Sequence, residues 1–350
     1  MVGDTIGTAP PPRARPRWRL ALGALLSLGG LALAFFNRQW LGEAIGLVRT
    51  SRPLWLLAAL AIILVSYLIS SQVFRVALRS LGYRVGVLRL WATALVAIVT
   101  SQSLPAGGVG SYAFLLRTFR RHGLTPGLAA LVAALEALSY ATAMIVFAAF
   151  GLVYLASHAL APGADDSSLL GPLLAGLTAA LVLGSVVALL TRSPDTLAGW
   201  LRAIHRLLSR ALGRPRGDAW VDRAVGEVVR ARELVAGRKR LVAQLVAIQL
   251  LALSGHSLAL LVILLSLGAH VGAGVVFAAF GIALLTSTFN VLPGGGGTVE
   301  TVLVVTLAQL AAGPAAVPAA ILFRLLNFWA MLPVAGICYG WLSNDRPAAG

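Results

Sequence analysis

Three charged side chains lie inside long apolar stretches of this sequence, namely Glu136, Glu300 and Arg324. An ionisable group at membrane depth costs about 2.5–3.5 kcal/mol on insertion scales, so each of these residues needs a partner, water or a ligand. Glu136 and Arg324 either form a structural ion pair or contribute to gating and substrate contact. Glu300 either stabilises the start of a helix through the helix dipole or binds a cationic headgroup or a proton.

Glu300 follows a Pro-Gly segment that interrupts an apolar stretch between about residues 271 and 312. Proline cannot donate a helical hydrogen bond, and each glycine costs about 1 kcal/mol relative to alanine in a helix. Non-helical backbone persists at membrane depth only inside protein or beside a wet cavity. Its N–H groups at a helix N-terminus would favour an anion such as a lipid phosphate; alternatively, the glycines only permit a tight turn. The candidate lipid-binding or substrate-binding residues are Pro293, Gly294, Gly295, Gly296, Gly297 and Glu300.

A second Pro-Gly segment lies upstream and indicates an internal duplication. When Pro105 is aligned with Pro293, a proline follows 21 positions later in both copies, and a charged residue follows 31 positions later. Paired Pro/Gly-interrupted segments in corresponding halves are typical of the binding sites of transporters. The matched residues are Pro126 with Pro314 and Glu136 with Arg324. The candidate binding residues of this first segment are Pro105, Gly107, Gly108 and Arg117.

Composition places the chain in a membrane. It is 59% hydrophobic and 11% charged, with a mean hydropathy of +0.88, whereas soluble domains carry about 25% charged residues. The net charge of +16 is spread over short arginine-rich stretches between apolar runs, as in cytoplasmic loops, so we expect no nucleic-acid partner. One cysteine, Cys338, excludes an intrachain disulfide.

The order of apolar and basic stretches predicts an all-α polytopic membrane protein with about six full spans and two re-entrant helical hairpins. A full crossing at about 88–104 would put the arginines near residue 120 outside, against the positive-inside rule, so we interpret this stretch as re-entrant. The second broken stretch then enters from the opposite side, which makes the duplication an inverted repeat. The expected spans are about 18–36, 53–74, 125–156, 170–191, 241–266 and 315–342.

These elements divide the chain into five parts. A disordered cytoplasmic tail (1–17) precedes an N-terminal membrane half (18–191) with the first Pro-Gly loop. A basic cytoplasmic segment (192–240) separates it from a C-terminal membrane half (241–342) with the second loop, and a cytoplasmic tail (343–350) follows. The basic segment has the pattern of an interfacial amphipathic helix, with a solvated helical hairpin as the alternative. Both termini are expected in the cytoplasm.

The sequence shows no constellation typical of an enzyme. The five histidines lack metal-ligand spacing, and no phosphate-binding G-x-x-x-x-G-K-[ST] loop is present. We therefore expect no catalytic residues, no metal and no cofactor.

The segment Leu292–Glu300, with Arg324 in the following span, resembles the transmembrane region of lysylphosphatidylglycerol synthases and their stand-alone, flippase-like relatives. The first Pro-Gly segment departs from this family, whose members often carry an acidic residue and an arginine just after the glycines. Here residues 109–112 are Val-Gly-Ser-Tyr, and the nearest arginine is Arg117. The resemblance covers about residues 20–342 and implies the flippase half alone, without the aminoacyl-transferase domain.

The resemblance implies a multi-pass protein of the plasma (inner) membrane that translocates or binds an amphiphilic lipid between leaflets. Its partners would be membrane lipids (an anionic or aminoacylated phospholipid, or an isoprenoid or hopanoid lipid), together with lipid-biosynthesis enzymes. Two other functions fit the same broken helices. One is a secondary transporter of a small polar solute, and the other is a non-transporting scaffold for a lipid-synthesis complex.

Overall fold

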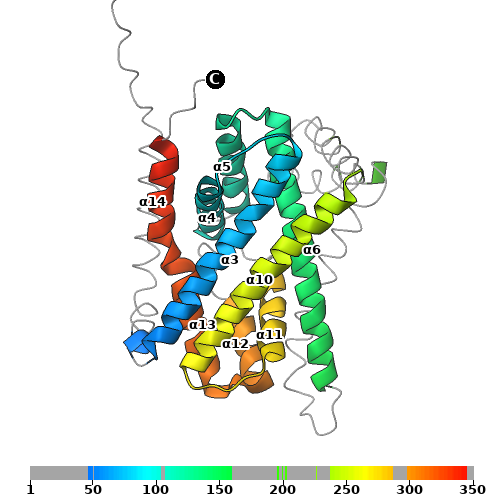
Figure 1. Cartoon of the computed structure of the whole chain (residues 1–350). Coiled ribbons are helices and arrows are strands. Elements are labelled where there is room, and N and C mark those ends of the chain that lie inside the picture. The colour runs from blue at the N-terminus through cyan, green and yellow to red at the C-terminus, as the bar shows by residue number, and fades with distance from the viewer. Residues whose placement is uncertain are drawn as a thin grey trace, which may run out of the picture.

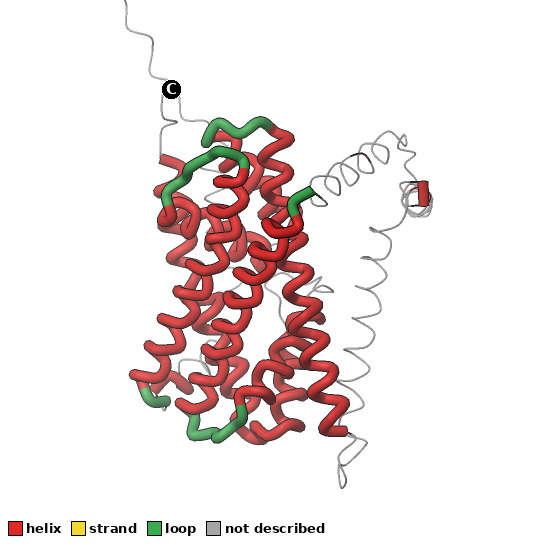
Figure 2. The backbone as a smooth tube through the Cα atoms, turned by 45° about the vertical axis from the view of Figure 1, so that its right-hand side comes forward, coloured by secondary structure: helices red, strands yellow, loops and turns green. Residues whose placement is uncertain are grey.

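The computed structural model describes residues 46–49, 51–103, 107–159, 195–196, 199, 202, 226, 237–286 and 298–344. Within these ranges every regular element is a helix. The helices form an upright bundle, and Figure 2 shows its described loops at the two ends of the helices.

Four stretches are long and apolar enough to cross a membrane. They are α3 (Pro53–Ser80), α6 (Pro126–Ala159), α10 (Lys239–Ser266) and a final run. The final run comprises η4 (Gly313–Ala315), α13 (Ala316–Arg324), η5 (Leu325–Trp329) and α14 (Met331–Asn344). Proline opens α3 and α6, where its missing N–H would have no partner in any case.

These four stretches coincide with four of the six expected spans. The other two, at about 18–36 and 170–191, lie outside the described residues, as do residues 1–17 and most of 192–240.

Two pairs of shorter helices flank the Pro-Gly segments. In the first half, α4 (Val87–Ser103) packs against α5 (Gly107–Arg121). In the second half, α11 (Ala273–Thr286) packs against α12 (Thr298–Leu307), which continues into η3 (Ala308–Ala312). All four helices have fewer than the roughly 20 residues that a crossing needs. Figure 1 shows α4 and α5 at the end of the bundle where α14 finishes, and α11 and α12 at the opposite end.

Among the described helices, one member of each short-helix pair packs on a long element of the other half. Helix α11 lies on α6, α4 lies on α14, and the two long helices α3 and α10 pack along each other (Figure 1). Glycines permit the close approaches. A Cβ at Gly281 would lie 2.3 Å from the Phe147 carbonyl oxygen, and one at Gly151 would lie 2.6 Å from that of Ala278. Helices α6 and α11 therefore touch backbone to backbone.

Helices α3 and α10 end in the same way. Both finish with the sequence Ser-Leu-Gly, and both glycines have positive φ, 86° at Gly82 and 79° at Gly268. The N–H of Tyr83 bonds the Leu78 carbonyl, and the N–H of Ala269 bonds the Leu264 carbonyl, each at 3.0 Å. This is the Schellman arrangement, which needs a left-handed residue after the cap. The two halves thus turn from a long helix into a short one through the same local structure.

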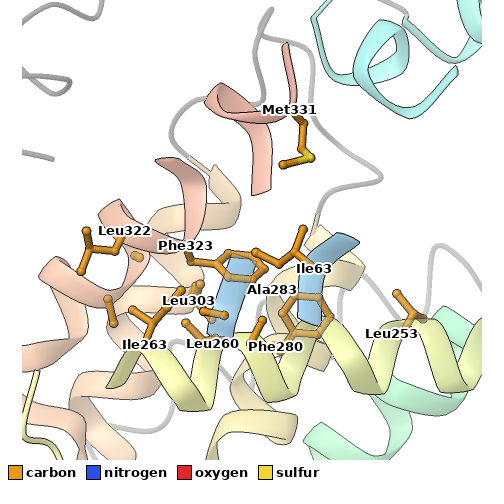
Figure 3. Close-up of a cluster of buried hydrophobic side chains, with 14 of the residues drawn as sticks. Ile63, Leu253, Leu260, Ile263, Phe280, Ala283, Leu303, Leu322, Phe323 and Met331 are labelled. Atoms are coloured by element: carbon orange, nitrogen blue, oxygen red, sulfur yellow. The ribbon is translucent and has the colours of Figure 1, made fainter. Parts of the chain in front are cut away.

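The main hydrophobic core joins both halves. Figure 3 shows part of it, with Ile63 of α3 and Leu260 of α10 near the aromatic rings of Phe280 and Phe323. These two rings meet edge to face at 5.9 Å, which links α11 to α13.

Candidate functional site

Glu300 and Arg324 form an ion pair between α12 and α13. Glu300 lies in the first turn of α12, three residues after the last glycine of the run, and Arg324 is the last residue of α13. Their side chains are 24% and 17% exposed, so both are largely shielded yet still accessible. The pair joins the start of a short helix to the final membrane-crossing run.

The repeat alignment suggested Glu136 as a partner of Arg324, and the structure shows a different pairing. Arg324 contacts Glu300, and the described residues include no ion pair between Arg324 and Glu136. Glu136 lies on α6, half-buried, with Tyr140 one helical turn further along. Equivalent sequence positions in the two repeats therefore do not meet as an ion pair.

Phe328 lies beside the guanidinium of Arg324. The Arg324 Cζ atom is 5.4 Å from the centre of the Phe328 ring, which is within the range of a cation–π interaction. The ring therefore gives Arg324 a second favourable contact, which does not depend on Glu300.

Arg324 directly precedes the π-helical segment η5, and Phe328 lies within it. The N–H of Ala330 bonds the carbonyl of Leu325 at 2.8 Å, five residues back rather than four. Pro333 follows in α14 and has no N–H to offer the carbonyl of Trp329 four residues earlier. Single π-turns inside α-helices frequently occur at functional sites.

A buried hydrogen-bond network lies next to this segment. The Tyr67 hydroxyl of α3 donates to Asn327 of η5, 2.9 Å from its side-chain oxygen and 3.0 Å from its backbone oxygen. The rings of Tyr67 and His256 of α10 meet edge to face at 5.0 Å. His256 Nδ1 lies 2.9 Å from the Ala252 carbonyl oxygen, to which it donates.

This network was not predicted from the sequence. The histidines were considered only for metal-ligand spacing, and neither Tyr67 nor Asn327 was a candidate. The signal was present, because Asn327 is a polar residue only three positions after Arg324 in an apolar span.

The structure describes only some residues of the two Pro-Gly segments. Pro105, Pro293 and Gly294, Gly295, Gly296 and Gly297 lie outside the described residues. Gly107 and Gly108 are the first two residues of α5, and Arg117 is exposed further along the same helix.

Among the described residues, neither a metal site nor the cavity at the turn after α3 lies at the Glu300–Arg324 pair. The described residues contain no group of three or more His, Cys, Asp or Glu side chains that could hold a metal ion. A cavity of about 540 Å³ lies at the turn between α3 and α4, lined by Arg79, Gly82, Tyr83 and Arg84. It is at the end of the bundle away from α12 and α13 (Figure 1).

Comparison with known proteins agrees with this architecture. A search of curated proteins finds no match for the chain. The sequence profile of a family described as the lysylphosphatidylglycerol synthase transmembrane region matches residues 20–335, which takes in both short-helix pairs and Arg324. The match spans well over half of the sequence and covers the long apolar helices as well as both Pro-Gly breaks. The chain therefore belongs to the lysylphosphatidylglycerol synthase transmembrane-region family.

Proposed function

We propose that this protein translocates an amphiphilic lipid, with a phosphate in its headgroup, between the two leaflets of the plasma membrane. The observation that carries the proposal is the position of the two short-helix pairs. They lie at opposite ends of one bundle, and one helix of each pair packs on a long element of the other half, α11 on α6 and α4 on α14 (Figure 1). Such an arrangement provides two related states that open to opposite sides.

The proposal treats the two halves as an inverted repeat. Its support is threefold: the matched Pro-Gly segments, the reciprocal packing of α11 on α6 and of α4 on α14, and the identical helix ends at Gly82 and Gly268. A pseudo-twofold axis would then pass near the contact of α3 with α10.

The Glu300–Arg324 pair is the proposed headgroup site. A lipid phosphate would take the place of the carboxylate on Arg324, aided by backbone N–H groups at the start of α12. The released carboxylate of Glu300 could then accept a cationic group of the same headgroup, so neither charge would be left alone at membrane depth. This exchange favours a headgroup that carries both signs of charge, such as an aminoacylated phospholipid, and requires no catalytic step.

Orientation follows from the charges at the helix ends. Arg79, Arg84, Arg120, Arg121 and Arg238 lie at or next to the ends of α3, α5 and α10 that meet at one end of the bundle (Figure 1). The opposite end carries fewer, because the loop of residues 267–272 contains no Lys or Arg and only Arg49 and Arg52 precede α3. By the positive-inside rule, the proposed cytoplasmic side is therefore the arginine-rich end, where α14 also finishes.

Reconstitution into vesicles tests the proposal directly. Fluorescent phospholipids with anionic, zwitterionic and aminoacylated headgroups are placed in one leaflet, and the fraction reached by a membrane-impermeant quencher is followed over time. We expect wild-type protein to speed the exchange of at least one of these lipids, and Arg324→Gln to abolish that effect.

The control variant is Arg79→Gln, which removes an exposed arginine at the end of α3 and should translocate normally. Exchange at the rate of protein-free vesicles for all three lipids would refute lipid translocation. Uptake of a small polar solute by the same vesicles would then favour the second candidate function.

A further inference from the structure

Tyr67, Asn327 and His256 connect three elements that are distant in sequence. Tyr67 belongs to α3 of the first half, and Asn327 is 260 residues further along, in the final run of the second half. Tyr67 is 3% exposed, His256 is 9% exposed and Asn327 is partly buried, so these polar groups meet largely inside the bundle. Burying polar groups among apolar helices is costly unless they are hydrogen-bonded, which makes their contact specific.

The network lies on the same helical run as the proposed headgroup site. Asn327 follows Arg324 by three residues, in the π-helical segment that begins directly after Arg324. Because Tyr67 bonds both the side chain and the backbone of Asn327, it restrains the turn itself and not only a rotamer. Tyr67 therefore restrains the part of the final run that begins at Arg324.

The other half shows no matching contact. The position 188 residues before Asn327 is Ser139 on α6, the same offset that relates Pro105 to Pro293. Its hydroxyl donates to the carbonyl of Glu136 in its own helix, at 2.9 Å, and not to another element. The two halves share their packing scheme, but this cross-link exists on one side only among the described residues.

We propose that Tyr67, Asn327 and His256 form a lock that positions Arg324 beside Glu300 and stabilises one of the two states of the protein. The lock opens when the headgroup replaces Glu300 on Arg324, because η5 then shifts relative to α3. This inference rests on the proposed function and adds the device that sets its resting state. Tyr67 and Asn327 act as positioning residues, since neither needs to touch the lipid.

Tyr67→Phe weakens the lock with the least disturbance. It removes the hydroxyl and keeps the ring that packs on His256. An average interhelical hydrogen bond in a membrane protein contributes about 0.6 kcal/mol, which corresponds to a change of about threefold in an equilibrium between two states. The matched control is Tyr140→Phe. Tyr140 packs against the same core, and the described residues show no hydrogen bond from its hydroxyl.

The test measures the distance between α3 and α13 in full-length protein in lipid nanodiscs. Spin labels replace Leu57 on α3 and Val317 on α13, which are 61% and 52% exposed, in a Cys338→Ala background. Pulsed electron paramagnetic resonance then gives the populations of the two distances. We expect the minor population to grow about threefold in Tyr67→Phe and to stay unchanged in Tyr140→Phe, with little change in melting temperature. Asn327→Ala should shift the populations in the same direction.

An unchanged distance distribution in Tyr67→Phe, or an equal shift in Tyr140→Phe, overturns the lock. The vesicle assay separates this failure from a failure of the proposed function. A population shift in protein that moves no lipid would keep the lock and refute lipid translocation. If wild-type protein translocates lipid but Tyr67→Phe leaves the distances unchanged, the lock is refuted and lipid translocation is kept.

Discussion

Replacing Glu300 by glutamine removes the carboxylate that pairs with Arg324 between α12 and α13. The expected loss in the free energy of unfolding follows from the surroundings of Arg324. An arginine at the centre of a membrane helix costs about 2.5–3.5 kcal/mol on insertion scales. Arg324 is 17% exposed and retains its contact with the Phe328 ring, so we expect Glu300→Gln to lower the free energy of unfolding by about 2 kcal/mol, below that range.

The reverse change should be milder. Arg324→Gln leaves the Glu300 carboxylate without this arginine, but a carboxylate can take up a proton, and we expect a loss of about 1 kcal/mol. The double variant leaves neither charge behind and should also lose about 1 kcal/mol, against about 3 kcal/mol for the sum of the single changes. The expected coupling energy is therefore about 2 kcal/mol.

Reversible unfolding in mixed micelles, followed by circular dichroism, measures these free energies. The comparison cycle uses Glu136→Gln with Arg324→Gln. Because no ion pair joins Glu136 to Arg324, these two changes should add within about 0.5 kcal/mol. Additive losses for Glu300 and Arg324, or strong coupling between Glu136 and Arg324, would show that the pairing described above is not the one that stabilises the protein.

Three further predictions concern the membrane arrangement and the glycines. Single cysteines replacing Arg120 and His270, in a background without Cys338, should be labelled from the cytoplasm and from outside respectively; labelling of both from one side would refute the opposed hairpins. Gly281→Ala should destabilise the protein by about 1–3 kcal/mol, because its Cβ would meet the α6 backbone, whereas Gly336→Ala, with open space around it, should change the melting temperature little. Gly296→Val should keep the melting temperature and lose lipid exchange if backbone N–H groups bind the headgroup; parallel losses of both would make the loop purely structural.

Much of the architecture was predictable, because the deciding interactions are local. Proline removes a donor and glycine destabilises a helix within one turn, so breaks near residues 105 and 293 follow from composition alone. The described helices end and begin on either side of both breaks. The long spans from Pro53, from Pro126 and up to Ser266 were likewise set by apolar length and by prolines at helix starts.

The partners of the charged and polar groups were not predictable in this way. The repeat alignment gave Arg324 and Glu136 equivalent positions, but equivalence under a pseudo-twofold axis does not require contact. Arg324 instead meets Glu300, which the chain brings to it from the start of α12.

The sequence by itself determined which of the described segments are long and apolar enough to cross a membrane, where they break and which charges lie among them, because hydropathy and backbone chemistry act over a few residues. Only the tertiary structure decided that Tyr67 bonds Asn327 across 260 residues and that η5 turns as a π-helix beside Arg324. Those contacts depend on how α3, α10 and the final run pack together. Side-chain types along one helix constrain that packing weakly, since many apolar faces in a membrane bundle are interchangeable.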